Sequence, residues 1–286
     1  MPIDRLDALL KRFSVSARMF HSGALCGIND FDTSSGMGQL HLIKRGPLRV
    51  QHGARKGIDI ADSSLLFYPR PHAHRLITDA KRGADMTCAY VEFSAGAVNP
   101  IARALPPFVA MPLAEIEGVE PVLERLFAEA FGRQCGRQAI VDRLFEVALI
   151  YIVRSLMNNA RVDVGLLAGM AHPQLAKALV AMHEAPARAW PLEKLARAAG
   201  MSRSAFAAAF RETVDTTPGD YLATFRVSVA QDLLRRGQPL TRVAQSVGYG
   251  SATAFSRVFK AVAGEGIRQW RARAVLDEPR EEAAPR

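Results

Sequence analysis

Two stretches in the carboxyl-terminal third carry basic, small and hydroxyl-bearing side chains at helical spacing. The first set is Arg203, Ser204, Ala207, Ala208 and Arg211, and the second is Ala252, Thr253, Ser256, Arg257 and Lys260. Side chains of these types can bind phosphate oxygens and the edges of DNA bases, because a helix with a small, polar and basic face fits the major groove. Each stretch therefore predicts an amphipathic helix with one buried face and one face for reading DNA.

The two stretches belong to an internal repeat that must position them. Ala196, Gly200, Phe206 and Phe210 recur as Ala244, Gly248, Phe255 and Phe259. The glycine can end a first helix in the left-handed conformation, and a serine, Ser202 or Ser251, can cap the second. In the second copy, Val258 and Val262 are expected to point inward with the two phenylalanines. Each copy is typical of a helix-turn-helix.

The segment between the copies predicts a single long helix that starts at Pro218 and ends at Gly237. A helix of about 18 residues spans ~27 Å. It can hold two recognition helices about one DNA turn apart on the same face of the duplex.

Residues 190–273 resemble the DNA-binding domain of the AraC/XylS family. The matching stretches are LEKLARAAGMSRSAFAAAF, TPGDYLATFRVSVAQDLL and VAQSVGYGSATAFSRVFK. The resemblance implies that Ser204, Ala207 and Ala208 face bases of one half-site, and that Ala252, Thr253, Ser256 and Arg257 face bases of the other. It implies phosphate contacts for Arg203, Arg211 and Lys260. The chain departs from the family at Ile267 and Trp270, where Pro and Tyr are usual, and Trp270 is expected to pack the last helix.

The excess positive charge lies in the same region. The chain has 37 Lys and Arg against 28 Asp and Glu, a net charge of +9. Residues 172–274 hold 15 of the basic and 7 of the acidic residues, and so contribute +8 (15 minus 7). One segment is therefore expected to touch a polyanion.

The amino-terminal half predicts a second domain. Short apolar runs separated by turn signals from Gly38 to Phe93 indicate a small β-barrel, and LHLIKRGPLRV with LLFYPRPHAHRL resembles the cupin-type sensor domain of part of the family. The prediction is an α+β multidomain chain with a cupin-like sensor domain (1–112), a helical pair and linker (113–170), an all-α domain with two helix-turn-helix motifs (171–274) and a disordered tail (275–286).

Three histidines of the strand-rich region invite a metal-binding hypothesis. His41, His72 and His74 could share one face of the barrel, because alternate residues of a strand do. Metal cupins follow their His-x-His pair closely with a glutamate, which is missing here. We therefore expect no metal and no cofactor; the histidines instead line a sensor pocket or form hydrogen bonds within the barrel.

Cys26 and Cys88 suggest a redox hypothesis. If they lie across from one another, oxidation could join them in a disulfide. The alternative is that both thiols are buried and inert. Cys135 is expected on a helix and exposed.

The helical pair expected between Val119 and Met157 leaves two interpretations open. It could form the surface of a homodimer, or it could brace the barrel.

The sequence thus predicts a DNA-binding transcription regulator, not an enzyme, controlled by a small molecule or an oxidant at its amino-terminal domain. The expected partners are double-stranded DNA, RNA polymerase, a small-molecule effector and a second copy of the chain. The sequence has no run of about 18 apolar residues, which is the length that would indicate a membrane span. We expect a cytoplasmic protein. A cupin metalloenzyme fused to DNA-binding helices and a constitutive nucleoid-type binder remain alternatives. Target promoter, inducer and sign of regulation are left open.

Overall fold

The computed structural model describes residues 4–159 and 164–276, which pack as two units. Among the described residues, a barrel unit comprises 15–93 and 105–159, and a helical unit comprises 4–14, 94–104 and 164–276. This division differs from the expected one, which placed all of residues 1–112 in the sensor domain and residues 113–170 in a helical pair and linker. Residues 4–14, 94–104 and 164–170 pack with the carboxyl-terminal helices instead.

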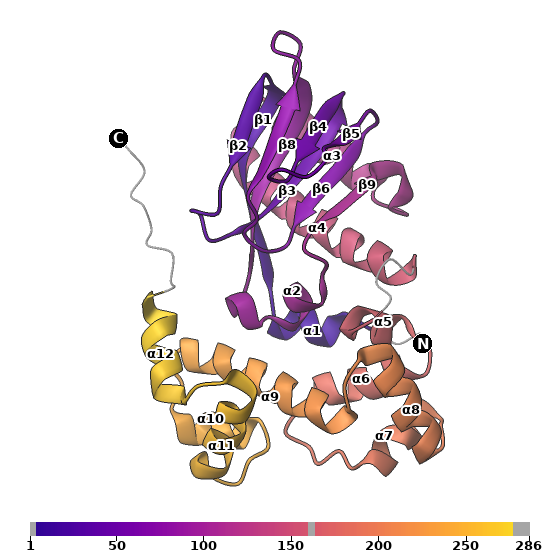
Figure 1. The fold of residues 1–286 in the computed structure, drawn as a ribbon, viewed down its shortest axis with the longest axis vertical. Helices are drawn as coiled ribbons and strands as arrows, with labels where there is room; N and C mark the ends of the chain where they lie inside the picture. Colours follow the sequence, from indigo (N-terminus) through magenta and orange to yellow (C-terminus); the bar gives the residue numbers. More distant parts are fainter. Residues whose placement is uncertain (1–3, 160–163, 277–286) are drawn as a thin grey trace. The chain divides into compact units, whose positions relative to one another are not determined.

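The barrel unit is built from two antiparallel sheets (Figure 1). Its strands are β1 (Val15–Leu25), β2 (Ile28–Phe31), β3 (Gly38–Arg45), β4 (Leu48–Gln51), β5 (Ile58–Ile60), β6 (Ser64–Tyr68), β7 (His74–Thr78), β8 (Ala84–Phe93) and β9 (Val109–Pro112). One sheet has the order β1-β8-β3-β6-β9 and the other β2-β7-β4-β5. Strands β1 and β2 precede the region where the sequence predicted the barrel to begin.

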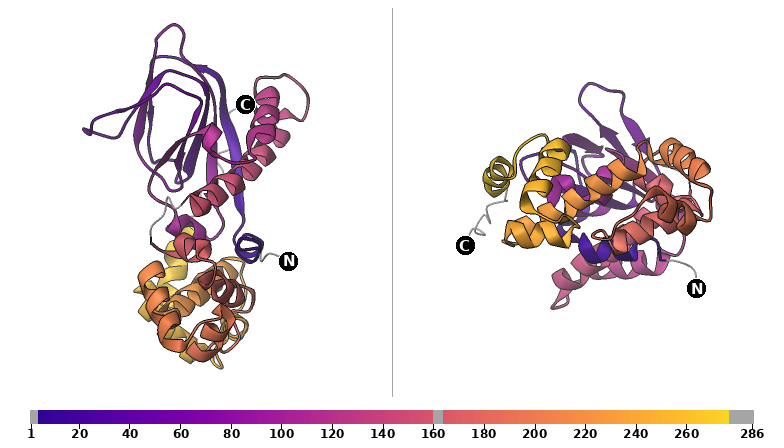
Figure 2. Two further views of the ribbon diagram at one scale, coloured as in Figure 1. Left: turned by 90° about the vertical axis from the view of Figure 1, so that its right-hand side faces the viewer. Right: turned by 90° about the horizontal axis from the view of Figure 1, so that it is seen from below.

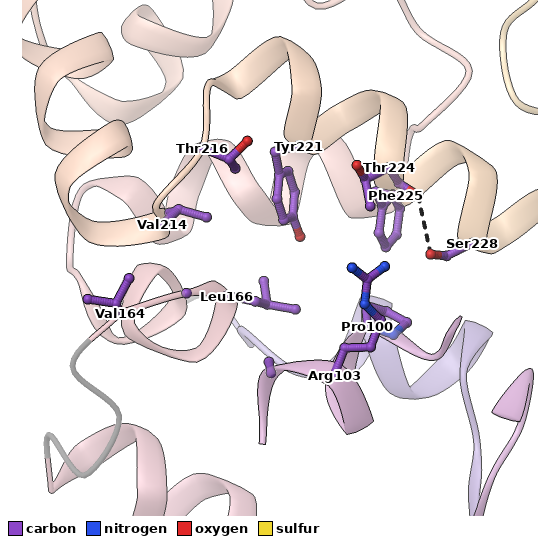
Figure 3. A pocket seen from close by; sticks show the side chains of 12 residues that line it. Pro100, Arg103, Val164, Leu166, Val214, Thr216, Tyr221, Thr224, Phe225 and Ser228 are labelled. Atoms are coloured by element: carbon purple, nitrogen blue, oxygen red, sulfur yellow. Dashed lines mark hydrogen bonds between the residues drawn. The ribbon is translucent and has the colours of Figure 1, made fainter. Parts of the chain in front are cut away.

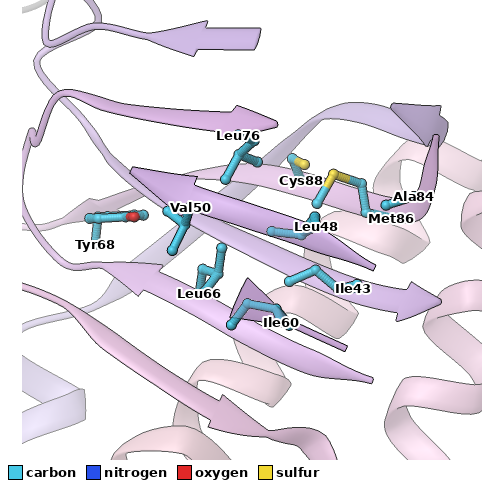
Figure 4. Close-up of a cluster of buried hydrophobic side chains, with 10 residues drawn as sticks. All are labelled: Ile43, Leu48, Val50, Ile60, Leu66, Tyr68, Leu76, Ala84, Met86 and Cys88. Carbon is cyan, nitrogen blue, oxygen red and sulfur yellow. The ribbon is translucent and has the colours of Figure 1, made fainter. Parts of the chain in front are cut away.

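The core of the barrel unit is a cluster of aliphatic and sulfur-containing side chains contributed by both sheets (Figure 4). Ile43, Leu66 and Met86 come from the first sheet, and Val50 and Leu76 from the second; none of these five is exposed. Strand pairs with one face turned to such a core are stabilised mainly by this apolar burial.

A short 3-10 turn, η2 (Leu113–Glu115), and the helices α3 (Glu120–Ala130) and α4 (Arg137–Asn158) complete the barrel unit. Helices α3 and α4 pack on each other, and α4 packs on β1. Strand β1 has a register shift between Met19 and His21. There the backbone N–H of Met19 donates to Asp142 Oδ1 (2.7 Å), and its carbonyl accepts from Gln138 Nε2 (3.0 Å). Side chains of α4 thus satisfy backbone groups that an irregular ladder leaves free.

The helical unit begins with segments from far apart in the sequence. Its elements are α1 (Asp7–Arg12), η1 (Gly96–Val98), α2 (Pro100–Ala104), α5 (Leu166–Ala171), α6 (Leu175–Glu184), α7 (Leu192–Ala199), α8 (Arg203–Val214), α9 (Pro218–Arg235), α10 (Leu240–Ser246), α11 (Ala252–Ala263) and α12 (Ile267–Leu276). Helix α12 includes residues 275 and 276, which we expected in the disordered tail. The rest of that tail lies outside the described residues.

Helix α9 runs through the middle of the helical unit and joins its two halves (Figures 1 and 2). Its first turn is capped by Thr217, whose hydroxyl accepts from the backbone N–H of Asp220 (3.1 Å), and Pro218 occupies the first helical position. Gly237, with φ of 76°, follows its carboxyl end. Helix α8 packs on α9, as do α10, α11 and α12.

Residues from the amino-terminal half are fastened to these helices by specific contacts. The guanidinium of Arg12 donates to the carbonyls of His183 (3.1 Å) and Glu184 (3.2 Å) at the end of α6. The ring of Phe13 lies edge-on to that of Phe225 on α9, with centroids 6.0 Å apart. Arg235, at the end of α9, donates to the carbonyl of Ala95.

Candidate DNA-binding surface

The first helix-turn-helix consists of α7 and α8, and its turn has the chemistry that the sequence predicted. Gly200 ends α7 in the left-handed region with φ of 66°. Ser202 then caps α8, its hydroxyl accepting from the backbone N–H of Ala205 at 3.2 Å. Phe206 and Phe210 are fully buried, which fixes the rotation of α8 about its axis.

That rotation turns the predicted reading face of α8 toward solvent. Arg203, Ser204, Ala208 and Arg211 are exposed, and Ala207 is half-buried. The Oγ atoms of Ser202 and Ser204 are 3.3 Å apart. The outer face of α8 therefore offers two cations at its edges and mainly methyl groups at its centre.

The second helix-turn-helix, α10 and α11, repeats this construction with a turn that is one residue longer, from Gly248 to Ser251. Gly248 has φ of 87°, and a Cβ at this position would collide with the carbonyl oxygen of Ala187. Glycine is thus required here by both conformation and space. Ser251 caps α11 through the N–H of Ala254 at 3.1 Å, and Phe255 and Phe259 are fully buried.

The reading face of α11 is richer in polar groups than that of α8. Thr253, Arg257 and Lys260 are exposed, while Ala252 and Ser256 are half-buried. The hydroxyl of Ser256 donates to the carbonyl of Ala252 (2.7 Å), which leaves its oxygen able to accept a further hydrogen bond.

One expectation about α11 is wrong: Val262 is 37% exposed rather than buried. Val258 is half-buried, intermediate between the two faces.

The last helix closes the second motif. Trp270 is buried and packs on Phe259, with ring centroids 5.6 Å apart. Arg235 of α9 stacks over the Trp270 ring at 5.1 Å. The replacement of the usual tyrosine by tryptophan therefore keeps the packing role predicted for this position.

The cations of the helical unit fall into two groups. Some are paired on the surface, such as Arg197 with Glu193 (3.0 Å) and Arg236 with Asp232 (2.9 Å). Within the described residues, by contrast, no carboxylate pairs with the four cations of the reading faces: Arg203, Arg211, Arg257 and Lys260. Unpaired cations on two helices joined by α9, which is 18 residues long, form a surface suited to the phosphates of DNA.

Comparison with known proteins agrees with both units. A cupin family model matches residues 4–158, and a helix-turn-helix domain model matches residues 195–273. An AraC-like transcription regulator of Streptomyces antibioticus is 30% identical over 292 residues, covering 92% of this chain and 95% of the relative. The chain belongs to the AraC-like transcription regulators. It is a DNA-binding protein with a cupin-type amino-terminal domain, as the sequence predicted.

Two further matches concern a second relative and a solved structure. An AraC-like regulator of Streptomyces lividans is 32% identical over 254 residues, covering 79% of this chain and 84% of the relative. The DNA-binding domain of AdpA, solved in complex with a target DNA, is 29% identical, with a TM-score of 0.34, covering 37% of this chain and 96% of that domain. The relatives are named as regulators rather than enzymes. Among the described helices, none is long and apolar enough to cross a bilayer.

In this AraC-like regulator, the three histidines singled out from the sequence gather inside the barrel unit. His41 Nε2 and His74 Nε2 are 2.9 Å apart, and the ring of His72 lies beside that of Tyr68. His52, which the sequence did not single out, joins the group through a 2.8 Å hydrogen bond between its Nε2 and the Tyr68 hydroxyl.

The proton positions in the His41–His74 pair follow from their other contacts. His74 Nδ1 lies 2.8 Å from the carbonyl oxygen of His72, so it carries the proton and donates. Its Nε2 must then accept from His41 Nε2, which leaves His41 Nδ1 as a bare acceptor. Neither this nitrogen nor Gln39 Oε1, both buried, has a partner among the described residues.

Burial keeps both histidines uncharged at neutral pH. It lowers the pKa of His74 to about 4, and together with the neighbouring His74 and His21 it lowers the pKa of His41 well below its usual value. Within the described residues, no three His, Cys, Asp or Glu side chains are grouped to hold a metal ion. Metal analysis of the purified protein tests the metalloenzyme alternative.

The cysteines do not meet the geometric condition for a disulfide. Cys88 faces His21 and His41 across its neighbouring strands, whereas Cys26 follows Leu25, whose partner is Ala84. Four residues of strand separate Ala84 from Cys88, or ~13 Å, while bridged cysteines have Cα atoms within ~7 Å. Cys88 is buried, which raises its thiol pKa, whereas Cys26 is exposed. An oxidant response through Cys26 or Cys88 stays a prediction, tested by separate Cys→Ser variants. Cys135 is exposed, as expected, but it lies in the turn between α3 and α4 and not on a helix.

Proposed function

We propose that this chain is a sequence-specific regulator that reads two successive major grooves of one duplex with α8 and α11. The observation that carries the proposal is the pair of solvent-facing recognition surfaces whose cations lack acidic partners in the described part of the chain. Bases of one half-site contact Ser204, Ala207 and Ala208, and bases of the other contact Ala252, Thr253, Ser256 and Arg257. Arg203, Arg211 and Lys260 bind phosphates.

The experiment begins with mapping of bound sites in the genome, followed by affinity measurements on one mapped operator. Arg257→Ala should weaken binding by ~1–3 kcal/mol and relax the preference for one base pair, because an arginine that pairs with a base edge specifies that base. Arg203→Ala should weaken binding to all duplexes alike and reduce the slope of log affinity against log salt by about 1.

Arg133→Ala is the matched control, because Arg133 is an exposed arginine of the barrel unit. It should leave operator affinity and its salt dependence unchanged. An operator affinity that is insensitive to Arg257→Ala contradicts the proposal, as does binding with no preference over random duplex.

We also propose that a signal at the amino-terminal half controls DNA affinity or the contact with RNA polymerase. Chain connectivity supports this coupling. Strands β1 and β8 pair up to Val15 and Phe93, and the residues just beyond both ends, 4–14 and 94–104, pack in the helical unit. A change in the pairing of β1 with β8 would therefore displace segments that contact α6 and α9. Promoter output measured with and without small molecules or oxidants tests this control.

The helical pair supports the proposal of a homodimer. Phe131 follows α3, and Ile140 and Val147 lie on α4; these three apolar side chains are 38–39% exposed. Burial of such side chains in a second copy would remove their apolar surface from water. Val147→Asp should shift the chain toward the monomer in sedimentation, whereas Leu192→Asp, at an equally exposed leucine of the helical unit, should not. A wild-type chain that is monomeric at all concentrations excludes the dimer.

A further inference from the structure

A cavity of about 350 Å³ lies within the helical unit, where α2 faces α5 and α9 (Figure 3). Leu166 of α5 and Val214 of α8 form one wall, and Tyr221 and Phe225 of α9 form another. Pro100 and Arg103 of α2 close the opposite side, so the cavity is completed by a segment from the amino-terminal half of the chain.

The position of α2 is fixed by Asn99. Its Oδ1 accepts from the backbone N–H groups of Ile101 (2.8 Å) and Ala102 (3.1 Å), which caps the short helix. Its Nδ2 donates to the carbonyl of Ser94 (2.8 Å), the first residue after β8. The opposite wall is tied as well, because the N–H of Gly165 donates to the carbonyl of Thr213 at the end of α8 (2.9 Å). The cavity walls are thus held by local hydrogen bonds.

The cavity has one charged lining residue among the described residues, Arg103. Its guanidinium points across the cavity toward α9 and, within the described residues, pairs with no carboxylate (Figure 3). Three of the lining hydroxyls, those of Tyr221, Ser228 and Thr216, are otherwise engaged or turned away. Tyr221 Oη is 2.5 Å from His183 Nε2, Ser228 donates to the carbonyl of Thr224 (3.2 Å), and the hydroxyl of Thr216 points out of the cavity.

One cation set in apolar walls defines the chemistry of the occupant. Ligand sites combine mainly apolar walls with a few polar groups that fix orientation, and the volume lies at the small end of such sites, ~300–1,000 Å³. A guanidinium matches a carboxylate in two parallel hydrogen bonds. A cation would be repelled, and inorganic phosphate would leave the aromatic and aliphatic walls unfilled.

We propose that this cavity binds a small monocarboxylate with an apolar body, its carboxylate on Arg103 and its body between Leu166 and Phe225. The regulatory meaning of the site rests on the proposed function. The ligand would hold α2, which follows β8 and η1 in the chain, against α9, which joins the two helix-turn-helix motifs. Occupancy would therefore favour one arrangement of α9 and change operator affinity.

The test uses the full chain and calorimetric titration with octanoate and 4-phenylbutyrate, each compared with its uncharged primary amide. At least one carboxylate should bind one to one, with its amide about tenfold weaker, because the amide loses the charge-assisted hydrogen bonds. Arg103→Gln should weaken the carboxylate by a similar factor and leave the amide unchanged. Ala104→Phe, which fills the cavity from α2, should abolish binding of both.

Arg133→Gln is the control, an exposed arginine in the other unit that should bind the probes as the wild type does. Thermal unfolding of each variant shows whether it is folded; Arg103→Gln is expected to fold normally because Arg103 is exposed. If neither carboxylate binds at millimolar concentration, the proposed site is wrong. It is equally wrong if Arg103→Gln and Ala104→Phe bind the carboxylate as the wild type does.

Failure of the site and failure of the proposed function give different results. A carboxylate that binds through Arg103 while the chain selects no operator upholds the site and overturns the proposed function. Operator binding that responds to Arg257→Ala, without any carboxylate binding, upholds the function and overturns the site. If both occur, operator affinity measured with and without the carboxylate should differ in the wild type and not in Ala104→Phe.

Discussion

The two helix-turn-helix motifs share one scaffold but differ in what they present to solvent. Each has a left-handed glycine, a serine cap and two fully buried phenylalanines. The centre of the α8 face, however, consists of Ala207 and Ala208, whereas the α11 face presents Thr253 and Arg257. The difference teaches that the side chains exposed to DNA can vary while the buried residues that build the motif stay the same. We expect α11 to discriminate between bases and α8 mainly to add affinity.

The motifs also differ in their surroundings. The first motif is enclosed, because α5 and α6 pack on α8, α6 packs on α7, and α1 packs on α6. The second motif packs on α9 and α12. Segments of the amino-terminal half thus reach the first motif through α5 and α6, since α2 packs on α5 and α1 on α6, which suits this motif to receive a signal.

The largest expected difference concerns the buried phenylalanines. Phe210→Ala and Phe259→Ala should each lower the free energy of unfolding by ~3–5 kcal/mol, because each leaves a cavity in a packed core. The chain has two tryptophans, Trp190 before α7 and Trp270 in α12, so fluorescence of single-tryptophan variants reports on each motif. Phe210→Ala should shift mainly the unfolding transition that Trp190 fluorescence reports (the Trp190 transition). Phe259→Ala should shift mainly the one that Trp270 fluorescence reports (the Trp270 transition). Equal shifts of both would mean that the motifs unfold as one.

The two turn glycines should differ in their tolerance of a methyl group. Gly200→Ala should lower the free energy of unfolding by ~1–2 kcal/mol, the penalty for an alanine in the left-handed conformation. No steric penalty is added, because nothing lies within 4 Å of the added Cβ. Gly248→Ala should cost at least about twice as much, because its Cβ also collides with the backbone of Ala187. Chemical denaturation followed by circular dichroism measures both. Equal costs would show that the segment around Ala187 moves aside freely.

Acid should weaken the first motif more than the second. Burial lowers the pKa of His183 to about 3, whereas in the unfolded chain it is near 6.5. As pH falls below 6.5, only the unfolded state gains this proton, so the free energy of unfolding decreases by up to ~1.4 kcal/mol per pH unit until the folded-state pKa is reached.

Between pH 7 and pH 5 the Trp190 transition should therefore move to lower denaturant concentration by more than the Trp270 transition. Tyr221→Phe, which removes the hydroxyl beside His183 Nε2 but keeps the imidazole, should retain this pH dependence. His183→Gln, which removes the titrating group, should flatten it. A Trp190 transition that is independent of pH in the wild type would contradict the assignment.

The smallest expected effect concerns the helix caps. Ser202→Ala and Ser251→Ala should each cost ~1 kcal/mol, because each leaves one backbone N–H of the first turn without its acceptor. The two cap distances, 3.2 and 3.1 Å, are nearly equal, so the costs should be nearly equal too. Ser246→Ala, at the end of α10, lacks a cap role and serves as the control. If the two substitutions lowered the free energy of unfolding by markedly different amounts, the two motifs would differ more in stability than their similar cap distances indicate.

The helix-turn-helix motifs could be predicted because their signals are local. A glycine, a serine and a helical period within about 20 residues determine where each helix starts and ends. Val262 was wrongly expected in the core because a helical period states which residues share a face, not how far along the helix an opposing surface extends. Its exposure depends on packing from elsewhere in the chain.

The amino-terminal half was harder to predict because its pairings are long-range. Strand β1 pairs with β8, some 70 residues later, and its register shift near Met19 breaks the alternation that marks a strand. The histidine group was predicted only in part, since His52 approaches Tyr68 through folding rather than spacing. The attachment of Phe13 to Phe225 had no signal in either segment alone.

The alternation of segments 4–14, 94–104 and 164–276 with the barrel segments has a consequence for protein engineering. The polypeptide passes between the two units four times: after residues 14, 93 and 104, and again between residues 159 and 164. A chimera with a single junction before α6 replaces the whole chain before that point with a foreign sensor. Leu9, Phe13 and Ile101, all buried here, would then be lost, and the helices that pack against them would lack matching side chains. Functional exchange of sensors in this family should therefore require three helical segments to be inherited together, from the same parent.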